Sequence, residues 1–225
     1  MRPVSIICDF EQAAIHAFQD AFPTVRIKGC FFHLAQNMHT HLVSLGLSNL
    51  YKTDSDFALW AKMIIALAFV PLEKMDEYMD TLAAGLPDEL IPLFHWFEDT
   101  YIGRQNRLRN VRMNPMFAPE IWNLYERTVN DEDRTNNHAK AANRRLQYEL
   151  GMHHPSIWKS IDALRKVQKG RDAFLEKLIA GYPPPKKLKK YRNADERIKK
   201  IVMEVESSEP IEFLKGIAHN YEMKK

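Results

Sequence analysis

The spacing of hydrophobic positions divides the chain into an α/β beginning and a long helical remainder. Residues 3–8 form a short, apolar, β-branched run, which predicts a buried strand. Residues 10–18 repeat apolar side chains at helical spacing, and residues 25–32 begin with the alternation of a second strand. A second helix is predicted from His33 to about Gly46. The first fifty residues therefore predict strand, helix, strand and helix, a piece of an α/β sheet layer.

The pattern is mostly helical from residue 54 onward. Apolar side chains at spacings of three and four predict helices over 56–68, 71–84 and 87–97. Residues 101–119 hold several Arg and Asn side chains with little apolar content, which predicts an exposed loop.

Two helices are predicted around a polar segment near the middle of the chain. Thr135, Asn136 and Asn137 are helix-capping residues ahead of good helix formers, so a helix should begin there. A long helix should open at 155–158, continue to about Ala180, and end at the breaker Gly181-Tyr182-Pro183-Pro184-Pro185. Further helices are predicted over 195–205 and in the tail. We therefore expect four segments: a partial sheet layer at 1–50, a helical insertion at 51–130, two final helices at 131–180, and a basic linker with a C-terminal helix at 181–225.

Composition favours an intracellular protein. The chain has 225 residues, 45% of them hydrophobic, enough for one sizeable core or two small ones. The formal charge of +3 is mildly basic and does not by itself require a nucleic-acid partner. The two cysteines fit a reducing compartment. The longest apolar run, Met63 to Pro71, is far too short to span a bilayer. We expect a soluble protein with no membrane partner and no signal peptide.

Asp9 is the first candidate for chemistry. It follows a predicted buried strand, and ligands bind in α/β folds at the carboxyl ends of strands. The same position also suits a residue that caps the following helix, because the helical pattern begins at Phe10. Position alone leaves both interpretations open.

Cys30 and His33 form the second candidate. A Cys and a His three residues apart at a strand-to-helix junction are suitable zinc ligands. A closed site needs a second pair, and the available helpers are Cys8, His39 and His41 at unusual spacing. A single Cys-x-x-His is therefore a weak indication of zinc.

Basic residues gather in the last third of the chain. Residues 186–192 are a dense basic run, Lys186-Lys187-Leu188-Lys189-Lys190-Tyr191-Arg192, preceded by Arg144, Arg145, Arg165, Lys166 and Lys169. Such charge suits solvated helix faces, and it equally suits a phosphate-binding patch or a nuclear import signal.

Several of these segments together resemble the catalytic domain of Mutator-like element (MULE) transposases. Residues 134–146 are similar to the family's Arg-Thr-Asn-Asn-x-x-Glu-x-x-Asn-Arg-x-Leu phrase, which opens its last catalytic helix. The segment Asp9 to Ile15 resembles the motif of the family's second metal-binding aspartate. Residues 30–37 resemble its Cys-x-x-His motif, which is associated with DNA handling. The resemblance continues through 96–103 and covers most of the chain.

The chain departs from the family pattern at two catalytic carboxylates. Lys140 stands where the family has its third metal-binding residue, a Glu, and a charged lysine repels a metal cation. No segment matches the family's first catalytic Asp. Phosphoryl transfer of this kind needs carboxylates that converge on two divalent ions. Glu132 and Asp133 lie seven or eight residues before Lys140, ahead of the helix cap. For either carboxylate to replace the family's Glu, the backbone would have to follow a different path to the site. We expect no cofactor here, although the ancestral enzyme would use Mg²⁺ or Mn²⁺.

Taken together, these observations predict a mostly helical α/β protein, namely the C-terminal part of an RNase H-like fold with an all-helical insertion. The expected function is that of a catalytically inactive, transposase-derived domain that retains DNA binding and acts in the nucleus. The DNA-contacting residues expected are Cys30, His33, Arg144, Arg145, Lys186, Lys187, Lys189 and Lys190, and Asp9 is the expected metal ligand. The alternative is a non-enzymatic interaction scaffold. In either case a second copy or another chain is expected to cover the sheet edge at 4–7.

Overall fold

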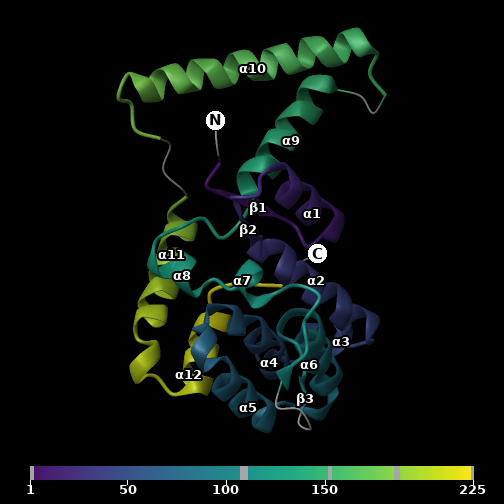
Figure 1. The fold of residues 1–225 in the computed structure, drawn as a ribbon, viewed down its shortest axis with the longest axis vertical. Coiled ribbons are helices and arrows are strands. Elements are labelled where there is room, and N and C mark those ends of the chain that lie inside the picture. Colours follow the sequence, from purple (N-terminus) through teal and green to yellow (C-terminus); the bar gives the residue numbers. More distant parts are fainter. Residues whose placement is uncertain (1–2, 107–110, 152–153, 185–187, 224–225) are drawn as a thin grey trace. The chain divides into compact units, whose positions relative to one another are not determined.

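The chain divides into two units, shown as ribbons in Figure 1. The computed structural model describes residues 3–106, 111–151, 154–184 and 188–223, with the backbone alone at 106, 111, 138–140 and 190. The first unit comprises residues 1–135 and 190–225, and the second comprises residues 136–189. The fold is mostly helical with a small two-stranded parallel sheet, so the predicted mostly helical α/β class is confirmed.

The sheet lies at the start of the first unit. Strand β1 (Ser5–Cys8) is followed by α1 (Gln12–Ala21) and then by β2 (Arg26–Gly29), which pairs with β1 in parallel. The register aligns Ser5 with Arg26 and Cys8 with Gly29, so alternate residues share a face. One face carries Ile6, Cys8 and Ile27, which lie in or against the core. The opposite face carries Ser5, Ile7, Arg26 and Lys28.

Helices make up most of the rest of the first unit. In chain order they are α2 (Phe31–Ser44), α3 (Ser48–Thr53), α4 (Ser55–Ala66), α5 (Met75–Gly85), α6 (Ile91–Phe97), α7 (Pro119–Trp122), α8 (Tyr125–Val129), α11 (Lys189–Met203) and α12 (Pro210–Ala218). Short 3₁₀ turns occupy Leu67–Phe69, Leu72–Lys74, Asp88–Leu90 and Val205–Ser207, and a π-helical turn occupies Glu98–Ile102. Among the described helices, none is long and apolar enough to cross a bilayer.

The core of the first unit joins segments that are far apart in the sequence. Helix α12 packs against α4 and α5 (Figure 1), so the C-terminal tail closes the helical insertion. The run from Met63 to Val70 is wholly buried beneath it. Burial of this much apolar surface, at about 25 cal/mol per Å², is the main force that holds the insertion together.

An aromatic cluster surrounds Tyr101, which lies in the π-helical turn. Phe10, Phe117 and Trp122 each make ring contacts with Tyr101, and the Trp122 indole N–H donates to the Tyr101 carbonyl oxygen at 2.7 Å. Gly103 ends the turn at φ +87°, and a Cβ atom there would lie 1.8 Å from the Met113 carbonyl oxygen. Only glycine fits this position without rearrangement.

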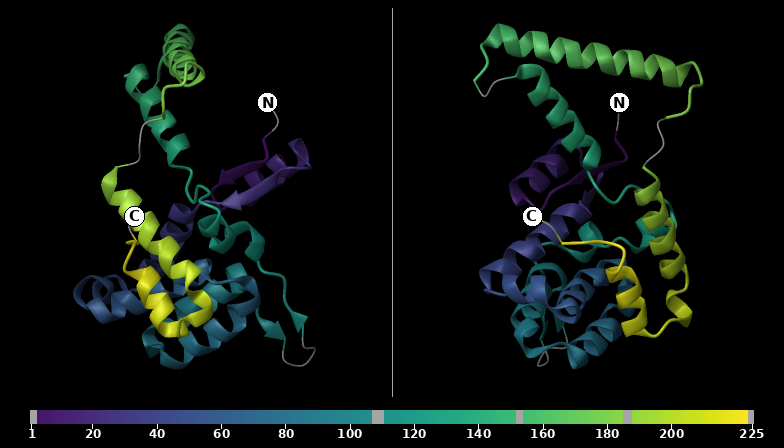
Figure 2. Two further views of the ribbon diagram at one scale, coloured as in Figure 1. Left: turned by 90° about the vertical axis from the view of Figure 1, so that its left-hand side faces the viewer. Right: turned by 180° about the vertical axis from the view of Figure 1, so that it is seen from behind.

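The second unit is a pair of helices, α9 (Asn137–Leu150) and α10 (Ile157–Ile179), which pack on each other as seen in Figure 2. Gly151 ends α9 in the left-handed conformation, at φ +64°. Ser156 caps α10, since its hydroxyl accepts a hydrogen bond from the Lys159 backbone N–H. Both helices begin close to the predicted positions.

Some predicted elements were wrong in detail. Phe10 lies ahead of α1 rather than inside it, and α2 begins at Phe31 rather than His33. Helix α3 was not predicted, because its six residues bury none of their side chains. The loop expected at 101–119 contains a short antiparallel pair, β3 (Gln105–Asn106) and β4 (Val111–Arg112). Helix α11 begins at Lys189, inside the basic run, rather than near 195.

Candidate functional site

The carboxyl ends of β1 and β2 bring two of the candidate segments together. Asp9 directly follows β1, and Cys30 directly follows β2. The two ends are joined because the Cys30 backbone N–H donates to the Cys8 carbonyl oxygen at 2.8 Å. Parallel pairing thus places Asp9 and the Cys30-x-x-His33 segment at the same edge of the sheet.

Asp9 does not cap α1. The N-cap of that helix is Glu11, whose side chain makes no capping hydrogen bond. The capping interpretation of Asp9 was therefore wrong, because two residues separate it from the helix. Its half-buried carboxylate acts electrostatically on Cys8: burial, followed by the nearby Asp9 and Cys30, raises the pKa of the Cys8 thiol to about 11.

Cys30 and His33 lie at the beginning of α2. Cys30 is the N-cap residue and is completely buried, whereas His33 is half-buried in the first turn. The other histidines considered as zinc helpers lie further along α2: His39 meets Tyr51 edge-on, and His41 stacks on Trp96 at 4.3 Å. Within the described ranges, no group of three or more His, Cys, Asp and Glu side chains is arranged to hold a metal ion.

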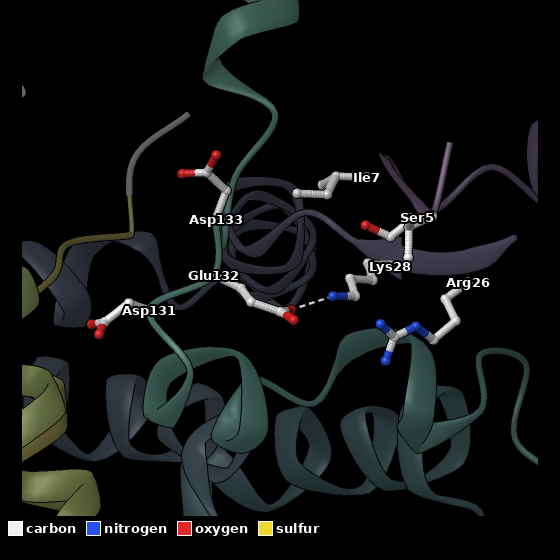
Figure 3. A pocket seen from close by; sticks show the side chains of 8 residues that line it. Ser5, Ile7, Arg26, Lys28, Asp131, Glu132 and Asp133 are labelled. Atoms are coloured by element: carbon white, nitrogen blue, oxygen red, sulfur yellow. Dashed lines mark hydrogen bonds and ion pairs between the residues drawn. The ribbon is translucent and has the colours of Figure 1, made fainter. Parts of the chain in front are cut away.

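An acidic loop, residues 131–133, lies beside the sheet in the same unit. Glu132 forms an ion pair with Lys28 of β2 (Figure 3), and Asp131 forms one with Lys199 of α11. The loop and the Ser5–Arg26 face of the sheet line a pocket of about 480 Å³. Hydrogen bonding from Lys28 lowers the pKa of Glu132. Glu132, one of the two carboxylates considered as a replacement for the family's Glu, is therefore already paired with a lysine.

The buried Arg127 and the half-buried Arg134 hold this loop in place, and sequence patterns assigned a role to neither. Arg127 donates to the Gly29 carbonyl oxygen at 2.8 Å and to the Asp133 carbonyl oxygen at 2.6 Å. Burial lowers the pKa of Arg127 to about 10. Arg134 forms an ion pair with Asp195 and lies 5.6 Å above the Phe69 ring. Arg134 stands in the phrase that resembles the transposase motif, whereas no sequence pattern singled out Arg127.

Lys140 belongs to α9 in the second unit, and its side chain lies outside what the structure describes. Asp9 belongs to the first unit, whereas Lys140 belongs to the second. Arg144 and Arg145 are exposed on α9, and the Arg145 guanidinium reaches the α10 backbone at Gly170. Of the basic run, Lys189 is exposed at the first position of α11. Lys186 and Lys187 lie outside the described residues, as does the side chain of Lys190.

Charge is distributed very unequally between the two units. Residues 136–189 contain twelve Lys and Arg against four Asp and Glu, a formal charge of +8. The rest of the chain contains 20 against 25, a charge of −5. Exposed basic side chains on α10 are Lys159, Arg165, Lys166, Lys169, Arg171 and Lys177. The intervals between Lys159, Lys166 and Lys177 are seven and eleven residues, close to two and three helical turns, so the sequence could have shown that the three lysines share a helix face.

Comparisons with family models, with curated proteins and with solved structures found nothing that matches this chain. The candidate site therefore depends on its own geometry and charge.

Proposed function

We propose that this chain is a DNA-binding domain derived from a Mutator-like element transposase, RNase H-like in ancestry, that no longer cleaves DNA. The observation that carries the proposal is the formal charge of +8 on residues 136–189, the unit that contains α9 and α10, in a chain whose other residues sum to −5. A local excess of this size attracts the phosphate backbone of nucleic acids, although the net charge of the whole chain is small.

The shape of α10 supports the proposal. Lys159, Lys166 and Lys177 lie on one face of a straight 23-residue helix and span about 27 Å along its axis. A duplex presents one phosphate charge per about 1.7 Å of its axis, so these lysines have several phosphates within reach at once. Exposed aromatic side chains at Tyr148, Trp158 and Tyr182 add surfaces on which unpaired bases can stack.

The sheet end supports the ancestry and argues against the ancestral reaction. A parallel strand-helix-strand unit with Asp9 and Cys30 at its carboxyl edge agrees with the order of the family's motifs. The donor set does not fit a two-metal site, because Glu132 is paired with Lys28 and a lysine occupies position 140. The proposed role is therefore binding of DNA in the nucleus, with the basic run at 186–192 as the import signal.

The decisive experiment is fluorescence anisotropy of labelled duplex and single-stranded DNA with the purified chain, across a salt series and without added metal. We expect binding that weakens steeply with salt. The double variant Lys166→Gln/Lys177→Gln should lower the slope of log K against log salt by about two, one for each phosphate contact removed.

The matched control carries the same change of charge on the first unit. Lys52 and Lys200 are both exposed there, so Lys52→Gln/Lys200→Gln removes two positive charges away from α10. This control should bind like the unchanged chain. Equal losses in the two double variants would mean that net charge alone attracts DNA, and absence of binding at low salt would reject the proposal.

The loss of cleavage has a separate test. Lys140→Glu restores the family's residue at that position, but residues 1–225 contain no match to the family's first catalytic Asp, and Glu132 remains paired with Lys28. We expect this variant to show no nicking of supercoiled DNA with Mg²⁺ or Mn²⁺. Metal-dependent nicking by Lys140→Glu would contradict the proposed inactivity and leave the DNA-binding proposal unaffected.

An interaction scaffold without a nucleic-acid role is the second candidate. The specific observation in its favour is the number of large apolar side chains exposed on the second unit, among them Ile157, Trp158 and Ile179. A chain that fails to bind DNA but binds a protein partner through these apolar side chains would favour this candidate.

A further inference from the structure

Helix α10 has an apolar side that α9 does not cover. The close approach of Arg145 to Gly170, together with the burial of Ala163, marks the side of α10 that faces α9. A second row of positions lies about 100–140° further around the helix axis. We call this row the α10 stripe; it consists of Ile157, Ile161, Leu164, Gln168, Arg171, Leu175 and Leu178.

The α10 stripe has the spacing of a coiled-coil seam. Its members are separated alternately by four and three residues, which is the a and d pattern of a heptad repeat. Ile157, Leu164 and Leu175 are 72%, 54% and 55% exposed. An exposed apolar seam over about six helical turns is unfavourable in water unless another surface covers it.

We propose that the α10 stripe pairs with the same stripe of a second copy of this chain, in antiparallel orientation. The stripe is apolar at both ends and polar in the middle, at Gln168 and Arg171. An antiparallel copy places Ile161 opposite Leu178 and Leu164 opposite Leu175 of the second copy, with Gln168 opposite Arg171. These three pairings, each made twice by symmetry, join apolar with apolar and polar with polar residues, and a two-fold axis relates the two helices.

Charge distinguishes antiparallel from parallel pairing. In a parallel pair Arg171 would meet Arg171 of the second copy inside the seam, and burying two like charges is costly. In the antiparallel pair, Arg165 lies beside the seam, close to Asp172 of the second copy. The two-fold symmetry repeats this pair of opposite charges, so it occurs twice in the dimer. The stripe also leaves Lys159, Lys166 and Lys177 on a different side of α10, so pairing does not depend on the proposed DNA contacts.

Sedimentation equilibrium of the full chain, from about 1 to about 100 μM, tests self-association. We expect a monomer–dimer equilibrium that Leu164→Glu/Leu175→Glu abolishes in this range. The control Gln147→Glu/Ala173→Glu adds the same charge at exposed positions outside the stripe and should still dimerise. Circular dichroism of both variants checks that the helices remain folded. A chain that stays monomeric throughout, or a dimer equally weakened by both variants, would overturn the proposal.

Disulfide trapping tests the orientation. A mixture of Leu164→Cys and Leu175→Cys chains, made distinguishable by mass, should form the mixed disulfide on mild oxidation. Leu164→Cys alone should cross-link poorly, because the two copies of position 164 lie about 16 Å apart along an antiparallel pair. Efficient cross-linking of Leu164→Cys with itself would indicate parallel pairing and reject the proposed arrangement.

Discussion

The two units of the chain differ in how much apolar surface they bury. The first unit packs most of its large apolar side chains in or against one continuous core, and its formal charge is −5. In the second unit, Ala163 is the one buried side chain among those described, and the charge is +8. Two helices of this kind gain little stability from packing on each other.

This difference indicates that the first unit is stable without a partner, whereas the second unit gains stability from binding one. A unit with its own core keeps its structure whatever binds to it. A basic helical pair with an exposed apolar seam gains stability when its charges meet phosphates or its seam meets another surface.

The largest expected difference concerns two tryptophans. Trp122 is 1% exposed and donates a hydrogen bond to the Tyr101 carbonyl oxygen, whereas Trp158 on α10 is 75% exposed. Trp122→Ala should reduce the free energy of unfolding by about 3–5 kcal/mol, because it leaves a cavity and an unpaired carbonyl. Trp158→Ala should change it by less than about 0.5 kcal/mol. Urea unfolding followed by circular dichroism measures both. Comparable losses would mean that the second unit has a core of its own.

Two glycines with positive φ give the next comparison. A Cβ at Gly103 would collide with the Met113 carbonyl oxygen, whereas a Cβ at Gly151 would have nothing within 4 Å. Gly103→Ala should cost more than about 2 kcal/mol, from backbone strain and the collision together. Gly151→Ala should cost about 1 kcal/mol, from the left-handed backbone alone.

Hydrogen exchange measured segment by segment separates the two glycine variants. Gly103→Ala should speed exchange throughout the first unit, and Gly151→Ala should speed it in α9 and α10 only. Fast exchange in the first unit of Gly151→Ala would show that the two units unfold together.

Sequence patterns predicted the α/β class, the order strand, helix, strand, helix at the start of the chain, and most of the later helices, because these depend on local periodicity. They missed α3, which buries no side chain, and misplaced the start of α11, where lysines conceal an amphipathic helix. They also missed Arg127 and Lys28, since each acts through a partner about a hundred residues away. Spacing along the chain carries no information on such long-range pairs.

The smallest expected effect compares one ion pair from each unit. Lys28 and Glu132 are 12% and 35% exposed, whereas Arg165 and Asp162, 3.8 Å apart on α10, are 79% and 69% exposed. The hydrogen bond from Lys28 lowers the pKa of Glu132 in the folded state, so the unfolded chain binds the proton more readily. The pair therefore stabilises the fold above the ordinary pKa of a glutamate. That stability, discounted to less than about 1 kcal/mol for solvent screening, is lost as the pH falls through the lowered value.

Glu132→Gln should remove this part of the acid dependence, and Asp162→Asn should leave the pH profile unchanged, because fully solvated pairs contribute almost nothing. Urea midpoints measured between about pH 6 and pH 3 provide the comparison. A profile that flattens equally in both variants would mean that burial beside the sheet gives the Lys28–Glu132 pair no advantage. It would also weaken the argument that Glu132 is too firmly held by its lysine to bind a metal ion.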